Sequence, residues 1–472
     1  MCSSDLSLDG GDDNDTLYGG AGTDILDGGN GNDLLMLSDG ADTYSGGAGV
    51  ESIMLDDTAG SAGHSYTLTA GSLSRDGVVV LNYDTIESLT VQGGNGGNTF
   101  NLQGTAAGTT TSILAGGGLN LIQVGSTAGV TPAVAGMLDG IKGGLSIVGS
   151  GVDPLILDDS GDASINTGTL TGTTLGGLGM GAVGISFSGM ASLALRLGAG
   201  ADTLAIVDTP LVAVTVNAGA GNDNVNVRGT TGPLFLNGEA GADTFNLGSL
   251  SPGTAGNVNA IRGAVSIDGG ASGADVDVVN VDETGDGSVN SGLLTATTLS
   301  GLGLGGVVGC GGIEALNISL GGGGNTFTVQ GSGAVATTIN SGSGNDTVLA
   351  QSTAAGTKLT LNGGAGDDRI QLGNGTNRLD DLLGALIVNG QAHTLKDVLT
   401  IDDSGGVAPR NYVLGATTLT RDGIAPVTYG SVEVLNLNLG TGLNTFQLVD
   451  VPALTTRSEE HTSELQSHLN LV

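Results

Sequence analysis

The chain of 472 residues has no tryptophan, and aromatic residues make up only 3 % of it. A large core anchored by aromatic side chains is therefore not expected, and many thin layers of aliphatic side chains are the better hypothesis. Basic residues are also few, with 12 Lys and Arg against 47 Asp and Glu, for a formal net charge of −35. This balance argues against nucleic acid or an anionic membrane as a partner, because both require basic patches, and it favours cations.

Proline and cysteine are scarce as well. There are 8 prolines, and the 90 glycines follow no Gly-X-Y period, which excludes a collagen helix. Hydrophobic residues make up 39 %, too many for a charged disordered tail. Of the two cysteines, Cys2 lies in an end segment of foreign composition, which leaves Cys310 without an intramolecular disulfide partner. The repeat position of Cys310 holds Tyr83, Phe187 and Tyr429 elsewhere, so we expect a core residue rather than a nucleophile.

The two ends differ from the rest of the chain, because residues 1–6 and 457–472 contain no glycine. Both segments resemble the translated sequence of a sequencing adapter, and such segments are excluded from fold reasoning. We therefore expect residues 1–6 and 457–472 to be foreign and the remainder to be a metagenomic fragment of a longer protein. The alternative for the tail is a genuine C-terminal helix with Leu465, Leu469 and Val472 on one face.

From residue 10 onward the chain repeats every nine residues, as GGDDNDTLY, GGAGTDILD, GGNGNDLLM, LSDGADTYS and GGAGVESIM. The sixth slot always carries a carboxylate, namely Asp15, Asp24, Asp33, Asp42 and Glu51. The eighth slot carries a large apolar or aromatic residue, namely Leu17, Leu26, Leu35, Tyr44 and Ile53. Because glycine allows positive φ, six residues of each unit form a tight turn, and the last three form a short strand. One apolar side chain per unit is buried only when units stack, which predicts a roll over residues 7–54.

Stacking brings the sixth-slot carboxylates to common edges, where they repel one another unless a cation lies between them. Ca²⁺ suits this position because it takes six to eight oxygen ligands. The units resemble the RTX (repeats-in-toxin, haemolysin-type) calcium-binding repeat GGxGxDxUx. This resemblance implies a parallel β-roll with Ca²⁺ shared between Asp15 and Asp33, Asp24 and Asp42, and Asp33 and Glu51. It also implies that the turns contribute Gly20, Gly22, Gly29, Asn30 and Gly31. The alternative is a solvated series of acidic turns without metal.

A longer repeat fills residues 55–456, and each copy begins with a strand that ends at Asp56, Asp158, Asp282 or Asp402. The copies span residues 55–156, 157–280, 281–400 and, in part, 401–456. Inside a copy, turns rich in glycine recur at spacings of 20 to 22 residues, with short alternating strands between them. This spacing predicts an all-β fold in which an elongated parallel β-helix or β-solenoid, with one such spacing per coil, follows the β-roll. A tandem array of β-sandwiches is the alternative.

The aspartates of these turns have two interpretations. They are further candidate Ca²⁺ ligands, because GAGND resembles the start of the RTX unit: Asp202, Asp223, Asp243, Asp346 and Asp368. The alternative is a ladder of Asn and Asp turns that satisfies the backbone without metal. Uncharged residues fill the slot at Asn98, Asn325 and Asn444, which favours the metal-free ladder at those positions. The uncharged stretches 169–195 and 293–313 are interpreted as buried strands rather than membrane spans.

These patterns predict a calcium-binding, secreted or cell-surface structural protein, adhesin-like in build, whose acidic turns fold on Ca²⁺. Its expected partners are calcium ions and a surface glycan or protein ligand. No enzyme is expected, because His64 and His393 lie in no catalytic motif and resemble turn residues, and the sequence does not support a zinc site. The alternatives are a β-helix enzyme that modifies polysaccharides and the non-catalytic RTX portion of a larger secreted enzyme or toxin.

Overall fold

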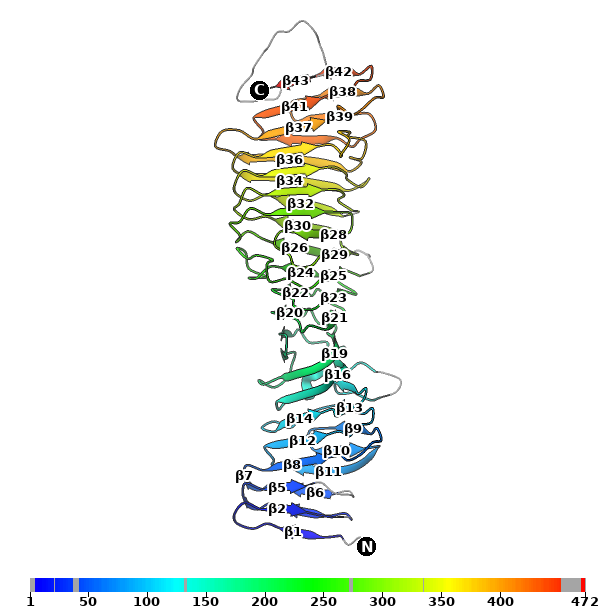
Figure 1. Cartoon of the computed structure of the whole chain (residues 1–472), viewed down its shortest axis with the longest axis vertical. Coiled ribbons are helices and arrows are strands. Elements are labelled where there is room, and N and C mark those ends of the chain that lie inside the picture. The colour runs from blue at the N-terminus through cyan, green and yellow to red at the C-terminus, as the bar shows by residue number, and fades with distance from the viewer. Residues whose placement is uncertain are drawn as a thin grey trace. The chain divides into compact units, whose positions relative to one another are not determined.

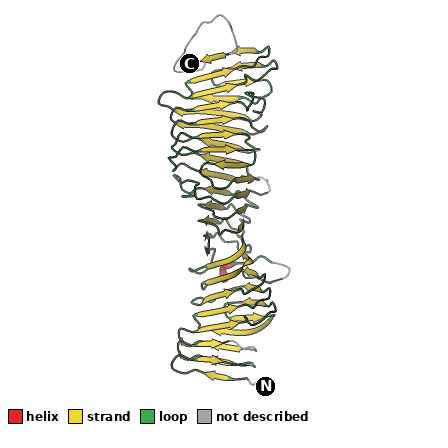
Figure 2. Ribbon diagram, in the orientation of Figure 1, coloured by secondary structure: helices red, strands yellow, loops and turns green. Residues whose placement is uncertain are grey.

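The structure is a computed structural model that describes residues 5–20, 22–36, 42–130, 134–270, 275–333, 335–450 and 468–471. Apart from one 3-10 turn, η1 (Leu138–Gly140), its secondary structure consists of β-strands (Figure 2), which confirms the predicted all-β class. The chain divides into two compact units, Met1–Asp223 with Thr231–Glu239 and Asn224–Thr230 with Ala240–Val472. Most of the terminal segments predicted to be foreign lies outside the described residues, as do residues 37–41 of the fourth nonapeptide unit.

The strands of the first unit are β1 (Ser7–Asp9), β2 (Thr16–Tyr18), β3 (Ile25–Asp27), β4 (Asn30–Gly31), β5 (Leu34–Met36), β6 (Asp42–Ser45), β7 (Ala48–Gly49), β8 (Ser52–Asp56), β9 (Ser65–Leu68), β10 (Ser72–Arg75), β11 (Val78–Asp84), β12 (Ser88–Gln92), β13 (Thr99–Leu102), β14 (Thr110–Leu114), β15 (Leu121–Val124), β16 (Leu145–Asp158), β17 (Thr167–Leu170), β18 (Thr174–Gly177), β19 (Ile185–Arg196), β20 (Thr203–Ile206), β21 (Ala213–Asn217) and β23 (Leu234–Asn237) (Figure 1).

The strands of the second unit are β22 (Asn224–Val227), β24 (Thr244–Leu247), β25 (Val265–Asp268), β26 (Val278–Asp282), β27 (Ser291–Leu294), β28 (Thr298–Gly301), β29 (Val308–Gly311), β30 (Ala315–Ser319), β31 (Thr326–Val329), β32 (Ala336–Asn340), β33 (Thr347–Ala350), β34 (Lys358–Ala365), β35 (Arg369–Leu372), β36 (Ala385–Ala392), β37 (Val398–Asp402), β38 (Asn411–Leu414), β39 (Thr418–Arg421), β40 (Val427–Gly430), β41 (Val434–Asn438), β42 (Thr445–Leu448) and β43 (His468–Leu471). Strand β43 pairs antiparallel with β41, so these four residues are not part of the helix considered for the tail.

The nonapeptide block forms a parallel β-roll, as the repeat pattern predicts. Strands two units apart pair in parallel, β1 with β3, β3 with β6, β2 with β5, and β5 with β8. The eighth-slot side chains point inward, and Leu26, Leu35, Tyr44 and Ile53 are buried. The turns stack as well, since β4 pairs with β7. Stacked turns and stacked strands therefore hold the same repeat slots above one another.

Beyond the roll, parallel stacking continues as a β-solenoid within each unit. In the first unit β19 pairs with β21 and β21 with β23. In the second unit β30, β32 and β34 stack in parallel, and so do β31, β33 and β35. Hydrogen-bonded residues in these coils are 20 to 22 positions apart, which matches the predicted turn spacing. The parallel pairing confirms the solenoid, and a sandwich array does not describe these strands.

The prediction of one short coil length throughout residues 55–456 is wrong where the long repeats begin. Each copy there carries an antiparallel segment, β9–β10–β11, β17–β18–β19, β27–β28–β29 or β38–β39–β40. Antiparallel arms add residues between one stacked strand and the next, so bonded residues of adjacent coils are 36 or 37 positions apart at these levels. The sequence spacing missed this because it was read from the short coils alone.

The uncharged stretches 169–195 and 293–313 lie in two of these antiparallel segments, as strands of the solenoid. Among the described residues, the structure contains no helix with the length and apolar character needed to cross a membrane. Cys310 lies on β29 opposite Ile267 and is half-buried. Burial raises the pKa of its thiol to about 12, so the thiolate that a nucleophile requires is not formed near neutral pH.

Candidate metal centre

The sixth-slot carboxylates of the β-roll end the turns and point into the roll. Asp24, Asp33, Asp42 and Glu51 are at most 2 % exposed, and Asp15, nearer the chain start, is half-buried. Ionised carboxylates are rarely buried to this extent unless a partner neutralises them. The nine-residue repeat explains this burial. Side chains two positions apart in an extended segment point to the same face, so the sixth-slot side chain faces inward together with the eighth-slot residue.

Three of these carboxylates accept a hydrogen bond from the coil before them. The backbone N–H of Asp15 donates to Asp33 Oδ1 at 2.8 Å, and that of Asp24 donates to Asp42 Oδ1 at 3.0 Å. The N–H of Leu6 donates to Asp24 Oδ1 at 2.8 Å. The first two bonds join residues that the RTX resemblance pairs around ions. The three bonds fix one oxygen of Asp24, Asp33 and Asp42 and leave the other to a different partner.

The second carboxylate oxygen lacks a protein partner at several of these positions. Oδ2 of Asp15, Asp24 and Asp33 and both carboxylate oxygens of Glu51 are inaccessible to solvent and accept no hydrogen bond. A buried anionic oxygen without a partner is strongly destabilising. Burial raises the pKa of Glu51 to about 7, and the negative charge of the nearby Glu87 adds to the shift. A bound cation would be a partner for these oxygens, and it would lower the pKa of Glu51 because a positive charge favours the ionised carboxylate.

Glycine carbonyl oxygens lie next to the partnerless carboxylate oxygens. A Cβ added to Gly28 would be 2.5 Å from Asp33 Oδ2 and 2.5 Å from the carbonyl oxygen of Gly46. The turn thus brings two kinds of oxygen to one small space that only glycine leaves open. Carboxylate and backbone carbonyl oxygens are the ligands that Ca²⁺ prefers, so the residues present fit this ion.

The remaining turn residues lie around these spaces in different ways. Gly20 and Gly29 have φ of +90°, and Gly22 and Gly31 have φ near +146°, so all four need the conformational freedom of glycine. Gly29 and Gly31 also contact the backbone of the neighbouring turn too closely for a Cβ. Asn30 differs, because its side-chain amide is exposed and donates to Asp12 Oδ1 at 2.8 Å. Its side chain therefore bonds along the outer surface of the stacked turns.

A second carboxylate ladder lies in the second unit. The N–H of Asn325 donates to Asp346 Oδ1, that of Asp346 to Asp368 Oδ1, and that of Asp368 to Asp397 Oδ1, at 2.6 to 2.9 Å. All three aspartates are 1 % exposed, and their Oδ2 atoms have no hydrogen-bond partner. Burial raises the pKa of Asp346 to about 6 and that of Asp368 to about 7.

The turn before Asp368 has the same build as those of the β-roll. Its sequence, GGAGDD over residues 363–368, follows the nonapeptide pattern. A Cβ added to Gly363 would be 2.6 Å from Asp368 Oδ2 and 2.6 Å from the carbonyl oxygen of Gly390. Asp367 points elsewhere and accepts the N–H groups of Thr394, Leu395 and Lys396. At Asp368 the second unit therefore repeats the arrangement seen at Asp33, a partnerless carboxylate oxygen beside a glycine carbonyl oxygen. We call this arrangement an oxygen cage.

Three further candidates occupy ladder positions with other surroundings. Asp202 is 2 % exposed, its Oδ1 accepts the N–H of Asn166, and its Oδ2 accepts the N–H of Gly198 at 3.3 Å. The N–H of Asp202 in turn donates to Asp223 Oδ1 at 2.6 Å. In the second unit the N–H of Asp243 donates to Asp277 Oδ1 at 2.7 Å. Because both Asp202 oxygens accept hydrogen bonds, that residue needs a cation less than Asp368 does.

A ladder built from asparagine shows how the same geometry closes without metal. The N–H of Asn98 donates to Asn120 Oδ1, and the N–H of Asn120 donates to Asp153 Oδ1, both at 2.8 Å. The Asn98 amide nitrogen donates to the carbonyl oxygens of Gly94 and Ala115 at 3.1 and 3.0 Å. It thus places a donor where Asp33 and Asp368 place a second acceptor. At Asp33 and Asp368 the carboxylate oxygen and the glycine carbonyl oxygen are both hydrogen-bond acceptors. A cation placed between them would satisfy both.

Sequence reasoning missed the residues that continue or end the ladders. The N–H of Glu51 donates to Glu87 Oε2, that of Asp277 to Glu314 Oε2, and that of Asp397 to Glu433 Oε2, each at 2.8 Å. The recurring I/V-E pair at residues 86–87, 313–314 and 432–433 is the signal that marks the three glutamates. Their role was hidden because longer coils separate them from the previous ladder residue.

Comparison with known families agrees with this geometry. The model of the RTX calcium-binding nonapeptide repeat matches the chain in four copies, over residues 7–35 and 360–380. The second match includes the turn before Asp368, one of the further candidate Ca²⁺ ligands predicted from the sequence. No curated protein matches the chain. The chain thus carries RTX-type calcium-binding nonapeptide repeats in the β-roll and again beside Asp368.

Proposed function

We propose that this chain is a secreted or cell-surface structural repeat protein, adhesin-like in build, whose acidic turns fold on Ca²⁺. The observation that carries the proposal is the contrast between matched ladder positions. Asn98 donates from its amide nitrogen to the turn carbonyls, whereas Asp33 and Asp368 place partnerless carboxylate oxygens at the corresponding point. A bound cation satisfies acceptors on both sides of such a space and allows the carboxylates to stay ionised.

In the bound state Ca²⁺ supplies the positive charge that the turns lack. The chain's own residues do the rest: backbone N–H groups hold Oδ1 of each carboxylate, which leaves Oδ2 directed at the glycine carbonyls. Without the ion, neighbouring carboxylates repel one another, and their burial is unfavourable. Ion binding is therefore coupled to closure of the turns.

This coupling supports the proposed location. Extracellular calcium modules bind in the range of roughly 10⁻⁴ to 10⁻³ M, so ladders of this kind stay open where Ca²⁺ is scarce and close outside the cell. A chain that remains loose before export and becomes compact afterwards suits passage through a secretion channel. RTX repeats are typical of secreted proteins, which agrees with this assignment.

We further propose that the solenoid acts without catalysis of its own. The His64 ring nitrogen lies 2.7 Å from the Asp76 carboxylate at the surface, and Arg75 and Arg421 are committed to ion pairs with Asp57 and Asp403. These side chains therefore have structural partners. Incubation with neutral and acidic polysaccharides, followed by measurement of new reducing ends, tests this proposal, and release of such ends would contradict it.

The folding proposal is tested by circular dichroism during a titration from EDTA to about 5 mM Ca²⁺. We expect β signal to grow with Ca²⁺, and the Asp24→Ala, Asp33→Ala double variant to need a several-fold higher concentration at the midpoint. Asp27→Ala is the matched control, because Asp27 is an exposed neighbour in the same roll. An unchanged signal between chelator and Ca²⁺ would remove the proposal, and an unchanged midpoint would remove these two ligands.

A further inference from the structure

A histidine and two carboxylates meet at the last acidic ladder of the second unit. His393 follows β36, Asp397 precedes β37, and Glu433 precedes β41. One ligand atom from each of the three residues lies within 4.8 Å of the other two. His393 Nδ1 is 3.3 Å from Glu433 Oε1. Asp397 and Glu433 are 1 % and 9 % exposed, while the histidine reaches the cluster from the surface.

Hydrogen bonds fix which carboxylate atoms remain for a ligand. Asp397 Oδ1 accepts the N–H of Asp368 at 2.8 Å, which leaves Oδ2. That Oδ2 atom is buried and has no hydrogen-bond partner. Glu433 Oε2 accepts the N–H of Asp397 at 2.8 Å, which leaves Oε1, the atom nearest to His393. Asp397 Oδ2, Glu433 Oε1 and an imidazole nitrogen are therefore the available ligand atoms.

The turn that carries His393 differs from the oxygen cages. Asp368 follows Gly363 by five positions, whereas Asp397 follows Gly390 by seven, in the sequence GQAHTLKD. Asp367 Oδ1 accepts the N–H groups of Thr394 and Leu395 and so anchors the longer turn just after the histidine. A Cβ added to Gly390 would be 2.6 Å from Asp397 Oδ2, which keeps the backbone close to that oxygen. The two additional residues thus bring a nitrogen ligand to the ladder.

We propose that His393, Asp397 and Glu433 form a site for a divalent transition-metal ion of the Zn²⁺ class, distinct from the Ca²⁺ turns. Ca²⁺ selects oxygen ligands, whereas imidazole suits Zn²⁺ and its neighbours, and Asp and Glu carboxylates serve as Zn²⁺ ligands beside histidine. The partnerless Asp397 oxygen gives the site a buried anionic ligand, and the histidine gives it selectivity over Ca²⁺. The sequence alone did not indicate this site, because the three residues fit no metal-binding spacing.

The test uses the full chain in about 5 mM Ca²⁺, so that the calcium turns are filled while transition metal is added. Zn²⁺ binding is measured by calorimetry, and Co²⁺ binding by its visible ligand-field absorption. His393→Gln is compared with His64→Gln, a second histidine that also pairs with a carboxylate. His461 and His468 are present in both variants, so any binding by them cancels in the comparison.

We expect wild type and His64→Gln to bind Zn²⁺ and Co²⁺ alike, and His393→Gln to bind more than about tenfold more weakly at one site. Glu433→Gln, which keeps an oxygen for the Asp397 N–H, should lose affinity for Zn²⁺ and Co²⁺ as well. Equal isotherms for wild type and His393→Gln would overturn the proposal, as would complete suppression of Zn²⁺ binding by Ca²⁺. Neither result bears on the Ca²⁺ titration of the other turns, so the two proposals fail separately.

Discussion

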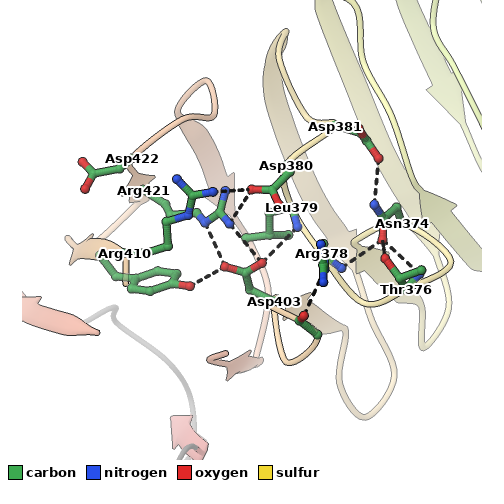
Figure 3. A network of polar contacts seen from close by, with 12 residues as sticks. Asn374, Thr376, Arg378, Leu379, Asp380, Asp381, Asp403, Arg410, Arg421 and Asp422 are labelled. Atoms are coloured by element: carbon green, nitrogen blue, oxygen red, sulfur yellow. Dashed lines mark hydrogen bonds and ion pairs between the residues drawn. The ribbon is translucent and has the colours of Figure 1, made fainter. Parts of the chain in front are cut away.

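The buried acid that follows the first strand of each long repeat is neutralised in two ways. In the first and last copies it pairs with arginine. In the first copy Arg75 Nη1 lies 2.8 Å from Asp57 Oδ1. In the last copy Arg421 Nε lies 2.8 Å from Asp403 Oδ2, as Figure 3 shows. Tyrosines complete both groups, as Tyr66 donates to Asp57 and Tyr412 donates to Asp403. Arginine and tyrosine thus supply the charge and the hydrogen bonds that a buried carboxylate needs.

In the two middle copies the same acid lies beside glycine. Gly177 and Gly301 occupy the arginine position, and the acids are Asp159 and Glu283, both 0 % exposed. Burial raises the pKa of Asp159 and that of Glu283 to about 7, against only one backbone N–H bond to each. The folded state therefore binds protons that the unfolded chain releases near pH 4 to 5.

This difference predicts that stability declines as pH rises. A carboxyl whose pKa is raised on folding stabilises the native state fully below its unfolded pKa, and this stabilisation is lost as pH rises through about 7. Each group contributes a slope of roughly 1.4 kcal/mol per pH unit in that window. The Asp159→Asn, Glu283→Gln variant should therefore show a smaller loss of unfolding free energy between about pH 5 and pH 8.

Denaturant unfolding at fixed Ca²⁺ measures this slope. Asp27→Asn, a change at an exposed position, serves as the control and should retain the wild-type pH dependence. A fall in the double variant equal to or steeper than that of wild type would show that the pKa values of the two acids are not raised on folding.

At the level of the element, the antiparallel segments set the coil length and depend on close packing at glycine. In the middle copies glycine replaces the tyrosine, at Gly168 and Gly292, and a leucine fills the space. Leu178 and Leu302 do so with φ of +50° and +55°, a conformation that side chains rarely adopt. In the middle copies glycine and leucine together thus fill the space that tyrosine fills in the first and last copies. The segment stays packed there although it has no arginine.

This packing predicts a large effect of a single methyl group. A Cβ on Gly292 would lie 2.5 Å from the Phe327 ring and 2.9 Å from Leu302 Cδ2. Gly292→Ala should therefore destabilise the second unit by about 1–3 kcal/mol, the usual effect of overpacking. Gly287→Ala is the control, because no atom lies within 4 Å of a Cβ there. Thermal unfolding in Ca²⁺ measures the effect of each variant. Equal melting temperatures for Gly292→Ala and Gly287→Ala would show that Phe327 and Leu302 shift to accept the methyl group at little cost.

For the chain as a whole, the formal net charge of −35 raises the question of whether Ca²⁺ acts by screening or by binding. The structure favours binding, because the ladder carboxylates are buried and their oxygens are inaccessible to bulk salt. NaCl at about 0.15 M, which screens exposed charges beyond about 8 Å, should not reproduce the Ca²⁺-induced gain in β signal. Mg²⁺ should act weakly, since it demands octahedral geometry and dehydrates reluctantly.

Circular dichroism in EDTA with added NaCl or MgCl₂ checks this expectation. Full recovery of the β signal in NaCl alone would show that general screening of the acidic chain, rather than specific ligation, drives closure.

Much of the fold could be predicted because its information is local. The nine-residue period indicated the β-roll, and the buried Leu26 and Leu35 occupy the slot that the period assigns to the core. The turn spacing indicated the solenoid for the same reason. The antiparallel segments were not predicted, because apolar and polar residues alternate along their strands as they do along the stacked parallel strands. At Asp368 the local GGAGDD turn was visible, whereas the continuation to Asp397 and Glu433 depends on coils of different lengths.

The sequence by itself determined the repeat register, the inward apolar slot and the carboxylate at each turn, because each follows from chemistry within a few neighbouring residues. Only the tertiary structure decided which carboxylate oxygens find a donor, as at Asp153, and which do not, as at Asp33 and Asp397. The physical reason is that every ladder bond joins residues of adjacent coils. The length of the intervening coil decides which residue donates to a given carboxylate. It also decides that His393 lies beside Asp397 and Glu433.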